Sequence, residues 1–388
     1  MDVLYESLNN NDIKSFEYYK WVEKTQKYFL QDLYQKFIKE GFPLFKLIEI
    51  ETINRCNGKC SFCPVNSDID PREYHYMSDE LFIKIINDLC DIGYNETISI
   101  YSNNESFLDP KIIERLEYAK NKLPTAYHML YTNGSLLTKE KYEHIVKLLD
   151  FIIINNYTDD LHIHDHLKWI NDKDLNEGTC QTLFYIRKQN KILTNRGGVS
   201  PNYNNLSNDW THICQYPFYQ MIVRPDGKLS GCCNDPLGEF TLGDLNQQSI
   251  LEAWYGEDHN NFKKNMILNG KQGYEKCTKC NIITSKFFQK EYYDDLINII
   301  KSNKKSLILC EEYDFKYIKK LLITNGIKEY NLCSNMIDID KYINDYFIIS
   351  TVGRSYDFFK YDPTTELCGH KYIVFIHKHS VSSITNYV

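Results

Sequence analysis

Between residues 45 and 187 strand-like segments alternate with helix-like segments, and this alternation restricts the fold more than any other feature of the chain. The strand-like segments are short and β-rich, whereas the helix-like segments place apolar residues three and four positions apart. Strands that alternate with helices typically pair in parallel, with the helices covering the sheet. The sequence therefore predicts an α/β fold around a parallel sheet, either open or closed into a barrel. The strand-like segments are 45–53, 96–102, 126–132, 150–156 and 181–187, and the helix-like segments are 78–93, 110–123 and 138–149.

Changes in this rhythm divide the 388 residues into regions. Residues 14–40 carry aromatic and aliphatic residues at spacings of three and four, which predicts one amphipathic helix. A polar, loop-like stretch near residues 200–215 precedes a short cysteine-bearing region, and a β/α rhythm returns from about residue 300. We expect an N-terminal helical segment (1–44), an α/β domain (45–205), a cysteine-rich extension (206–290) and a small α/β, Rossmann-like C-terminal domain (291–388).

Composition limits the classes of partner and the location. A net charge of −7 offers no general electrostatic attraction for nucleic acid. The first residues lack the basic and apolar regions of a signal peptide, and no apolar run approaches the ~18 residues of a membrane span. We therefore expect a cytoplasmic protein without nucleic-acid or membrane partners, and the sequence leaves the oligomeric state open. In a reducing cytosol, 13 cysteines favour metal ligation or chemistry over a disulfide framework.

Three cysteines lie within one short loop directly after the first strand of the α/β region. Cys56, Cys60 and Cys63 have the spacing C-x3-C-x2-C, and Phe62 precedes the last of them. Three thiolates on one loop can bind three irons of a [4Fe–4S] cluster and leave the fourth iron open to a small molecule. A zinc loop or incidental free thiols are the alternative, although zinc normally takes four ligands in a closed site and no fourth partner lies nearby.

This cysteine loop at the end of the first strand resembles that of the radical S-adenosylmethionine (SAM) superfamily. The resemblance implies a partial (β/α)6 TIM-like barrel in which the open iron chelates the amino and carboxylate groups of SAM. The reduced cluster then passes one electron to the sulfonium, and the 5′-deoxyadenosyl radical that forms abstracts a hydrogen from the substrate. It also implies a reductant such as flavodoxin or ferredoxin, and it places Phe62 beside the cofactors.

The resemblance further implies residues that contact SAM after the second strand. The sequence "SNNE" stands in the place of a Gly-Gly-Glu type motif, with Asn103 and Asn104 instead of the glycines and with Glu105 as the partner of the SAM amino group. Without the glycines, the approach of the backbone to SAM differs from that of the family. The alternative for Glu105 is an ordinary carboxylate at a strand end.

Three further SAM contacts follow from the same resemblance. Asn133, after the third strand, is expected to make a polar contact, and Asn155, on the fourth strand, is expected to meet the ribose. Arg187, at the end of the fifth strand, is a partner for the SAM carboxylate. The alternative for asparagines in such loops is ordinary turn formation.

A second set of cysteines lies downstream. Cys214, Cys232, Cys277 and Cys280 can supply four thiolates to a closed cluster, and the turn "PDG" (225–227) suits a hairpin. Together with "GDLNQQSILEAW" this pattern resembles the SPASM/twitch extension of radical SAM enzymes. Four matching cysteines favour the shorter twitch type with one auxiliary [4Fe–4S] cluster. A zinc ribbon is the alternative, because a CxxC pair with two further cysteines is good zinc spacing.

The resemblance to twitch-type aminocyclitol and sugar alcohol dehydrogenases implies an oxidoreductase. A fully ligated auxiliary cluster can accept the electron that a ketyl-like substrate radical must lose to become a carbonyl. We expect oxidation of a secondary alcohol on a sugar, aminocyclitol, nucleotide sugar or carrier-linked sugar. Arg196, shortly before the first auxiliary cysteine, is the expected catalytic residue. Because arginine stays protonated, it suits orienting a hydroxyl or stabilising an alkoxide-like oxygen.

Other interpretations remain open at this point. A surface arginine that caps a turn is the alternative for Arg196, and a free thiol at Cys233 would suit hydrogen return in an epimerase. A peptide-modifying maturase is a rival within the same class of enzyme. A non-catalytic zinc-binding scaffold is the rival of another class, and zinc without iron and sulfide in anaerobically prepared protein would favour it.

Overall fold

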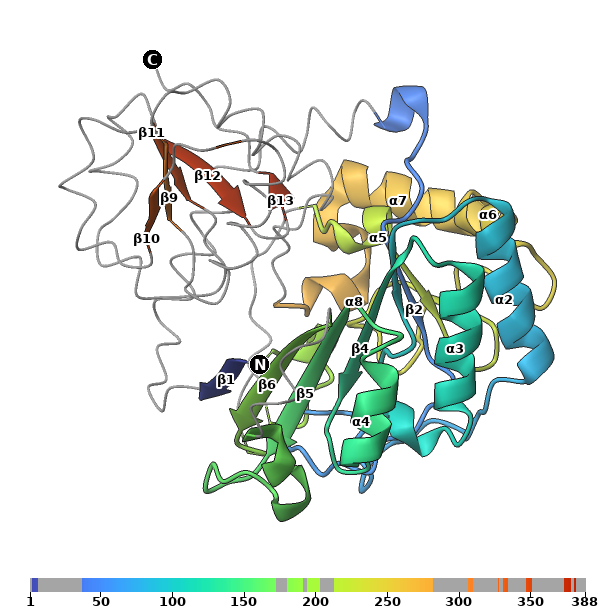
Figure 1. Cartoon of the computed structure of the whole chain (residues 1–388). Helices are drawn as coiled ribbons and strands as arrows, with labels where there is room; N and C mark the ends of the chain where they lie inside the picture. The colour runs from blue at the N-terminus through green and yellow to red at the C-terminus, as the bar shows by residue number, and fades with distance from the viewer. Residues whose placement is uncertain are drawn as a thin grey trace. The chain divides into compact units, whose positions relative to one another are not determined.

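The computed structural model describes residues 2–5, 37–171, 180–190, 194–202 and 213–281, together with residue 327 and five strands near the C-terminus. The chain divides into two compact units (Figure 1). Unit 1 contains residues 1–8 and 36–282, and unit 2 contains residues 9–35 and 283–388. Residues 37–40 are helical, and the rest of the predicted N-terminal helix lies outside the described residues.

Unit 1 is built on an eight-stranded sheet in the order β1-β6-β5-β4-β3-β2-β7-β8. Every neighbouring pair is parallel except β7 and β8, which are antiparallel. The five predicted strands are present as β2 to β6, and with β1 and β7 they form the seven-stranded parallel part of the barrel-like α/β fold. The strands are β1 (Asp2–Tyr5), β2 (Leu47–Ile50), β3 (Thr97–Ser99), β4 (Tyr127–Thr132), β5 (Phe151–Tyr157), β6 (Gln181–Arg187), β7 (Gln220–Val223) and β8 (Leu229–Ser230).

Helices α2 (Asp79–Asp91), α3 (Ile112–Lys122) and α4 (Lys139–Ile145) follow β2, β3 and β4 and lie along one side of the sheet (Figure 1). They match the three helix-like segments. The start of α2 is typical: the Ser78 hydroxyl accepts a hydrogen bond from the Leu81 N–H, and two acidic residues in the first turn face the positive end of the helix dipole. The other α-helices are α5 (Tyr216–Tyr219), α6 (Ile250–Trp254), α7 (Glu257–Asn269) and α8 (Glu275–Thr278).

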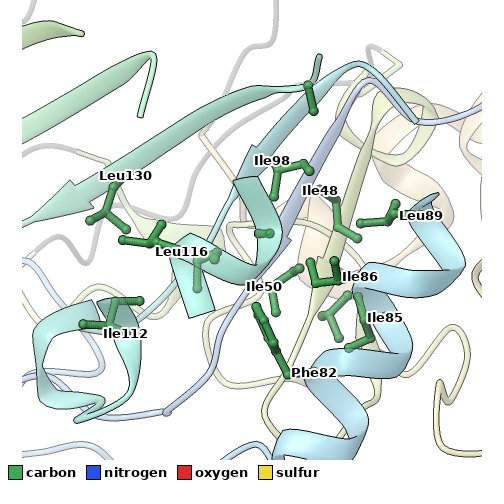
Figure 2. Packing of buried hydrophobic residues seen from close by; sticks show 14 of the residues in the cluster. Ile48, Ile50, Phe82, Ile85, Ile86, Leu89, Ile98, Ile112, Leu116 and Leu130 are labelled. Carbon is green, nitrogen blue, oxygen red and sulfur yellow. The ribbon is translucent and has the colours of Figure 1, made fainter. Parts of the chain in front are cut away.

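The strands of unit 1 separate apolar from polar side chains on the two faces of the sheet. One row, which includes Ile48, Ile50 and Leu130, packs against Phe82 and Leu116 of the helices (Figure 2). Because successive residues of a strand point to opposite faces, the alternate positions face away from this core. That second row includes Glu49, Asn155, Tyr185, Arg187 and Gln220. The sheet therefore presents a polar and aromatic face opposite its helices.

Strand β7 brings the cysteine-bearing region into the same sheet. It pairs in parallel with β2, with Val223 opposite Ile50, six residues before Cys56. The "PDG" turn then joins β7 to β8 as the predicted hairpin. Gly227 has φ +84, and a Cβ there would lie 2.4 Å from Asn246 Nδ2, so only glycine fits this turn without strain. The hairpin places the second cysteine set next to the strand that leads into the first.

Unit 2 contains a five-stranded sheet in the order β10-β9-β11-β12-β13. The first four strands are parallel, and β13 is antiparallel to β12. These strands lie in the region where the sequence shows a β/α rhythm, and apart from residue 327 the segments between β9 and β12 lie outside the described residues. The strands are β9 (Ser306–Leu309), β10 (Asn331–Cys333), β11 (Phe347–Ser350), β12 (Ile373–His377) and β13 (Ser380–Val381). In the part of the chain that the structure describes, no helix is both long and apolar enough to cross a membrane.

Candidate active site

The three clustered cysteines lie on an irregular loop that follows β2. The Gly58 N–H donates to Cys56 Sγ at 3.3 Å, and the Cys63 N–H donates to the Cys60 carbonyl at 3.1 Å. The buried side chain of Asn66 holds the loop closed, because its Nδ2 donates to the carbonyls of both Cys60 and Cys63. A Cβ on Gly58 would lie 3.4 Å from Cys56 Sγ and 3.9 Å from Cys60 Sγ. The loop therefore wraps closely around its thiols.

The thiols of this loop interact with one another. Within the described residues no three His, Cys, Asp or Glu side chains enclose a lone metal ion. Burial raises the pKa of Cys60 to about 12, and the charges of Cys63 and Cys56 add to this rise. The three thiols therefore interact electrostatically. Burial also raises the pKa of Cys56 to about 12, against the hydrogen bond from Gly58. Three grouped thiols, of which Cys56 accepts N–H···S bonds, fit the donor set of an iron–sulfur cluster.

Phe62, which is part of this loop, and Arg187, at the end of β6, both contact Tyr157. The Phe62 ring packs on Tyr157 with ring centroids 5.8 Å apart. The Arg187 guanidinium lies over the Tyr185 ring, 4.3 Å from its centroid, and it hydrogen-bonds Tyr157. Its Nε is buried and has no protein partner among the described residues. A buried, unpaired N–H at this position suits a carboxylate ligand.

Glu105 is buried at the centre of the "SNNE" segment. Its Oε1 accepts from Thr132 Oγ1 at 2.7 Å and from the Phe107 N–H at 3.2 Å, and its Oε2 accepts from the Asn133 N–H at 2.7 Å. Burial raises the pKa of Glu105, while these three donors oppose the rise. The carboxylate therefore joins the end of β4 to η1 (Ser106–Leu108), in addition to any contact with SAM.

The predicted asparagines surround the same place but differ in their partners. Asn133 Nδ2 donates to Asn57 Oδ1 at 2.9 Å and approaches Cys56 Sγ at 3.8 Å, so Asn133 supports the cysteine loop. Asn104 Oδ1 accepts from the Ser102 N–H, whereas its Nδ2 is buried without a partner among the described residues. Asn155 Oδ1 is buried and unpartnered in the same way. Such atoms are normally satisfied, which fits a polar ligand at this face.

Arg72 is a residue of this site that sequence reasoning missed. Its Nη2 donates to the carbonyls of Asn54 (2.9 Å) and Asn103 (3.1 Å), and its Nη1 pairs with Glu51 at 3.0 Å. The guanidinium thus holds the "SNNE" segment against the strand that leads into the cysteine loop. Nothing in the spacing of the sequence distinguishes Arg72 from other arginines, because its partners are backbone carbonyls from distant segments.

Arg196 lies at the opposite side of the site on η4 (Arg196–Gly198). Its Nη2 donates to Asn103 Oδ1, and its buried Nε has no protein partner among the described residues. Burial alone would lower the pKa of Arg196, but Cys63, Cys233 and two further acidic groups raise it above its ordinary value. Arg196 is therefore a protonated donor whose charge is favoured by a cysteine of the first set and by a cysteine of the downstream region.

The four downstream cysteines come together through elements far apart in sequence. Burial, followed by Cys233 and the other three cysteines of the set, raises the pKa of Cys232 well above its ordinary value. The CxxC pair forms a turn in which the Cys280 N–H donates to the Cys277 carbonyl at 3.1 Å. Lys271 Nζ donates to the Cys280 carbonyl at 2.8 Å and favours the thiolate of Cys277. Four thiols beside a buried cation fit a closed cluster site.

Cys233 follows Cys232 directly and adjoins the polar face of the sheet. Its N–H donates to Gln220 Oε1 at 3.4 Å, and its Sγ accepts from Asn234 Nδ2 at 3.5 Å. Gln220 Nε2 in turn donates to Glu49 Oε1 at 2.7 Å. Glu49 and Gln220 were not predicted, since a buried strand offers no sign of which polar residue faces a site.

Comparison with known proteins identifies these domains. Residues 50–204 match the model of the radical SAM superfamily. This chain carries a radical SAM domain. Residues 214–281 match SPASM, an iron–sulfur cluster-binding domain, and this match begins at Cys214 and ends one residue after Cys280. The radical SAM enzyme therefore uses a [4Fe–4S] cluster with SAM and carries an auxiliary iron–sulfur cluster, as predicted.

A curated protein and a solved structure each match a little under two thirds of the chain. The chain is 25% identical over 257 residues to the S-adenosyl-L-methionine-dependent 2-deoxy-scyllo-inosamine dehydrogenase of Niallia circulans, a match over 65% of this chain and 98% of that protein. The crystal structure of BtrN in complex with AdoMet and 2-DOIA superposes with a TM-score of 0.52 at 22% identity. That match covers 62% of this radical SAM enzyme and 95% of BtrN, and it confirms the fold.

Proposed function

We propose that this radical SAM enzyme oxidises a secondary alcohol of a small aminocyclitol or sugar to a carbonyl. The observation that supports this most is the buried Arg196 guanidinium, whose Nη2 donates to Asn103 of the "SNNE" segment and whose Nε has no protein partner among the described residues. The similar dehydrogenase of Niallia circulans supports the choice of an aminocyclitol. A nucleotide sugar or a carrier-linked sugar belongs to the same chemical class.

In this proposal Cys56, Cys60 and Cys63 hold the cluster that binds SAM, and Cys214, Cys232, Cys277 and Cys280 hold the auxiliary [4Fe–4S] cluster. When bound, these groups supply the 5′-deoxyadenosyl radical that removes a carbon-bound hydrogen and the acceptor for one electron. An external donor such as flavodoxin or ferredoxin provides the electron that starts each turnover.

The chain's own residues bind and orient the reactants. Glu105 and Arg187 are the proposed partners of the SAM amino and carboxylate groups, and Asn104 and Asn155 offer unpaired buried polar atoms for further contacts. Tyr157 and Phe62 form an aromatic wall beside the cysteine loop and exclude water. The exclusion of water protects a radical from side reactions.

Arg196 is the proposed contact to the substrate hydroxyl. Because its pKa is raised, Arg196 remains protonated and cannot accept the hydroxyl proton. Its unpaired Nε–H donates instead to the alcohol oxygen, which orients the carbinol and stabilises negative charge as the proton leaves. The complete oxidation removes one hydrogen atom, one proton and one electron from the carbinol.

The test is the mass of the product. Anaerobic enzyme with reductant, SAM and 2-deoxy-scyllo-inosamine should yield a product two mass units lighter that carries a carbonyl. A substrate deuterated at the reacting carbon should pass its deuterium to 5′-deoxyadenosine. If SAM is cleaved and no candidate alcohol loses two mass units, the dehydrogenase proposal fails.

An epimerase is a second candidate, because Cys233 adjoins the polar face of the sheet, where its N–H donates to Gln220 Oε1. A thiol there would return a hydrogen atom to the substrate radical and conserve the substrate's mass. In D2O an epimerase would give a product one mass unit heavier and would lose activity in Cys233→Ala. We expect Cys233→Ala to keep dehydrogenase activity, and a solvent-deuterated product would decide for the epimerase.

A further inference from the structure

Residues 194–202 connect the two cysteine sites, and we refer to them as the strap. We infer that Asn195 and Asn281 position Arg196 through this strap, so that the auxiliary cysteine segment holds the catalytic arginine as well as its own cluster. The inference rests on the proposed contact of Arg196 with the substrate. It concerns a pair of residues that touch neither cofactor nor substrate in the proposal, and their role is therefore one of positioning.

Asn195 and Asn281 hold each other by a reciprocal pair of hydrogen bonds. The Asn195 N–H donates to Asn281 Oδ1 at 3.0 Å, and the Asn281 N–H donates to Asn195 Oδ1 at 3.0 Å. Asn195 Nδ2 also donates to the Lys279 carbonyl. Asn195 is fully buried, it immediately precedes Arg196, and Asn281 immediately follows Cys280. The residue that precedes the arginine is thus hydrogen-bonded to the two residues that flank the last auxiliary cysteine.

The backbone of the strap has an unfavourable conformation next to Asn195. Arg196 has φ +49 and Gly197 has φ +71, a left-handed conformation that is unfavourable for a residue with a side chain such as Arg196. A Cβ on Gly197 would lie 2.5 Å from the Asn234 carbonyl oxygen and 3.3 Å from Lys276 Cε. Lys276 is itself fixed, because its Nζ pairs with Asp235 at 2.8 Å. Such a conformation persists only where its surroundings impose it.

The other end of the strap reaches the first cysteine loop. Ser200 Oγ donates to the Phe62 carbonyl at 2.9 Å, and Asn202 Nδ2 donates to Ser61 Oγ at 3.0 Å. The Ser200 N–H donates back to the Asn195 carbonyl at 3.0 Å, which closes the strap into a compact turn. Arg196 is therefore held between two anchors, one on each cysteine site, with its side chain directed to Asn103.

Removing the acceptor of the Asn195 N–H breaks one anchor selectively. In Asn281→Ala this N–H stays buried without a partner, which is costly, and the left-handed turn can relax. Asn281→Asp keeps an acceptor oxygen at the same place. Asn265→Ala is the matched control, because Asn265 Nδ2 donates to the Gly273 carbonyl at 3.0 Å within the same region and away from the strap.

The decisive experiment is a double-mutant cycle on reconstituted holoenzyme. Asn281→Ala should lower kcat for the oxidised product by about tenfold, the order expected for a buried unpaired donor, with less than about threefold loss in Asn281→Asp or Asn265→Ala. In the Arg196→Ala background, Asn281→Ala should cost less than about twofold, because the pair then has nothing to position. SAM cleavage per chain should stay unchanged, so that more 5′-deoxyadenosine forms per product.

A readout independent of activity accompanies the cycle. Iron and sulfide per chain should equal wild type in Asn281→Ala, while amide hydrogen exchange over 194–200 should rise in this variant and not in Asn265→Ala. Equal losses in both backgrounds, or loss of auxiliary iron in Asn281→Ala, would overturn the positioning role. Full turnover by Arg196→Ala alone would instead overturn the proposed function of the arginine, so the two failures are distinguishable.

Discussion

The two cysteine sites of unit 1 are built in opposite ways. Cys56, Cys60 and Cys63 lie on one loop, whose shape depends on nearby residues such as Gly58 and Asn66. The auxiliary cysteines, in contrast, come from segments between Cys214 and Cys280 that meet only through the β7–β8 hairpin and the turns around α7 and α8.

This difference indicates which substitutions, local or distant, should disturb each cysteine site. The thiols of a single loop are already close together in sequence, and distant residues such as Asn133 and Ser200 only add support to that loop. A site assembled from distant segments ties those segments together, so that its ligands and its connections to the strap depend on one another. Four changes can break or sharpen this contrast.

The largest effect is expected from removing the first site entirely. Replacing Cys56, Cys60 and Cys63 with Ala should abolish formation of 5′-deoxyadenosine, because only this site leaves an iron open to SAM. About four irons per chain should remain on the auxiliary site, since closed [4Fe–4S] clusters use four thiolates. Iron analysis and SAM cleavage with dithionite measure both outcomes. SAM cleavage by the triple variant would show that the assignment is wrong.

Removing one auxiliary thiol should separate the two half-reactions. Cys232→Ala should still cleave SAM but should lose the carbonyl product, because the electron of the substrate radical then has no acceptor. The ratio of 5′-deoxyadenosine to product, measured by mass spectrometry, reports this uncoupling. Cys90→Ala, which changes an exposed cysteine on α2, is the control. Retained product formation in iron-depleted Cys232→Ala would contradict an electron-accepting role of the auxiliary site.

A smaller effect is expected at Glu105, which connects the first site to the SAM pocket. Glu105→Gln should weaken SAM binding by about 1.5–3 kcal/mol, about 10- to 150-fold in Kd, through loss of a charge-assisted contact to the amino group. Thr132→Val is the control, because it removes a donor to Glu105 and leaves the carboxylate in place. If a titration finds equal SAM affinity in Glu105→Gln and wild type, then Glu105 has only a structural role.

The smallest effects are expected on stability, from replacing one glycine beside each of the two cysteine sites. Gly197→Ala should destabilise the protein by about 2 kcal/mol, because its φ is +71 and the new Cβ would meet the Asn234 carbonyl oxygen. Gly58→Ala should cost less than about 1 kcal/mol, because its Cβ would meet Cys56 Sγ at an ordinary contact distance. Anaerobic thermal unfolding of the two variants tests the order. A larger loss in Gly58→Ala would reverse the contrast between the two regions.

The sequence was sufficient for features that depend on neighbouring residues. The spacing of Cys56, Cys60 and Cys63 requires only a loop to bring the thiols together, so the radical SAM domain was predicted before the fold was known. Helices α2, α3 and α4 were predictable because periodicity and caps such as Ser78 act within a few residues. Strands β2 to β6 were predictable for the same reason.

Only the tertiary structure decided which distant groups meet. The pairing of β7 with β2, the hold of Arg72 on the Asn103 carbonyl and the reciprocal bonds of Asn195 and Asn281 each join segments far apart in the chain. These contacts use backbone carbonyls and amides, which every residue carries, so side-chain identity does not reveal them. The cysteine spacing was therefore sufficient to predict the chemistry of this chain. The placement of Arg196 on a strap between the two cysteine sites depends on long-range packing.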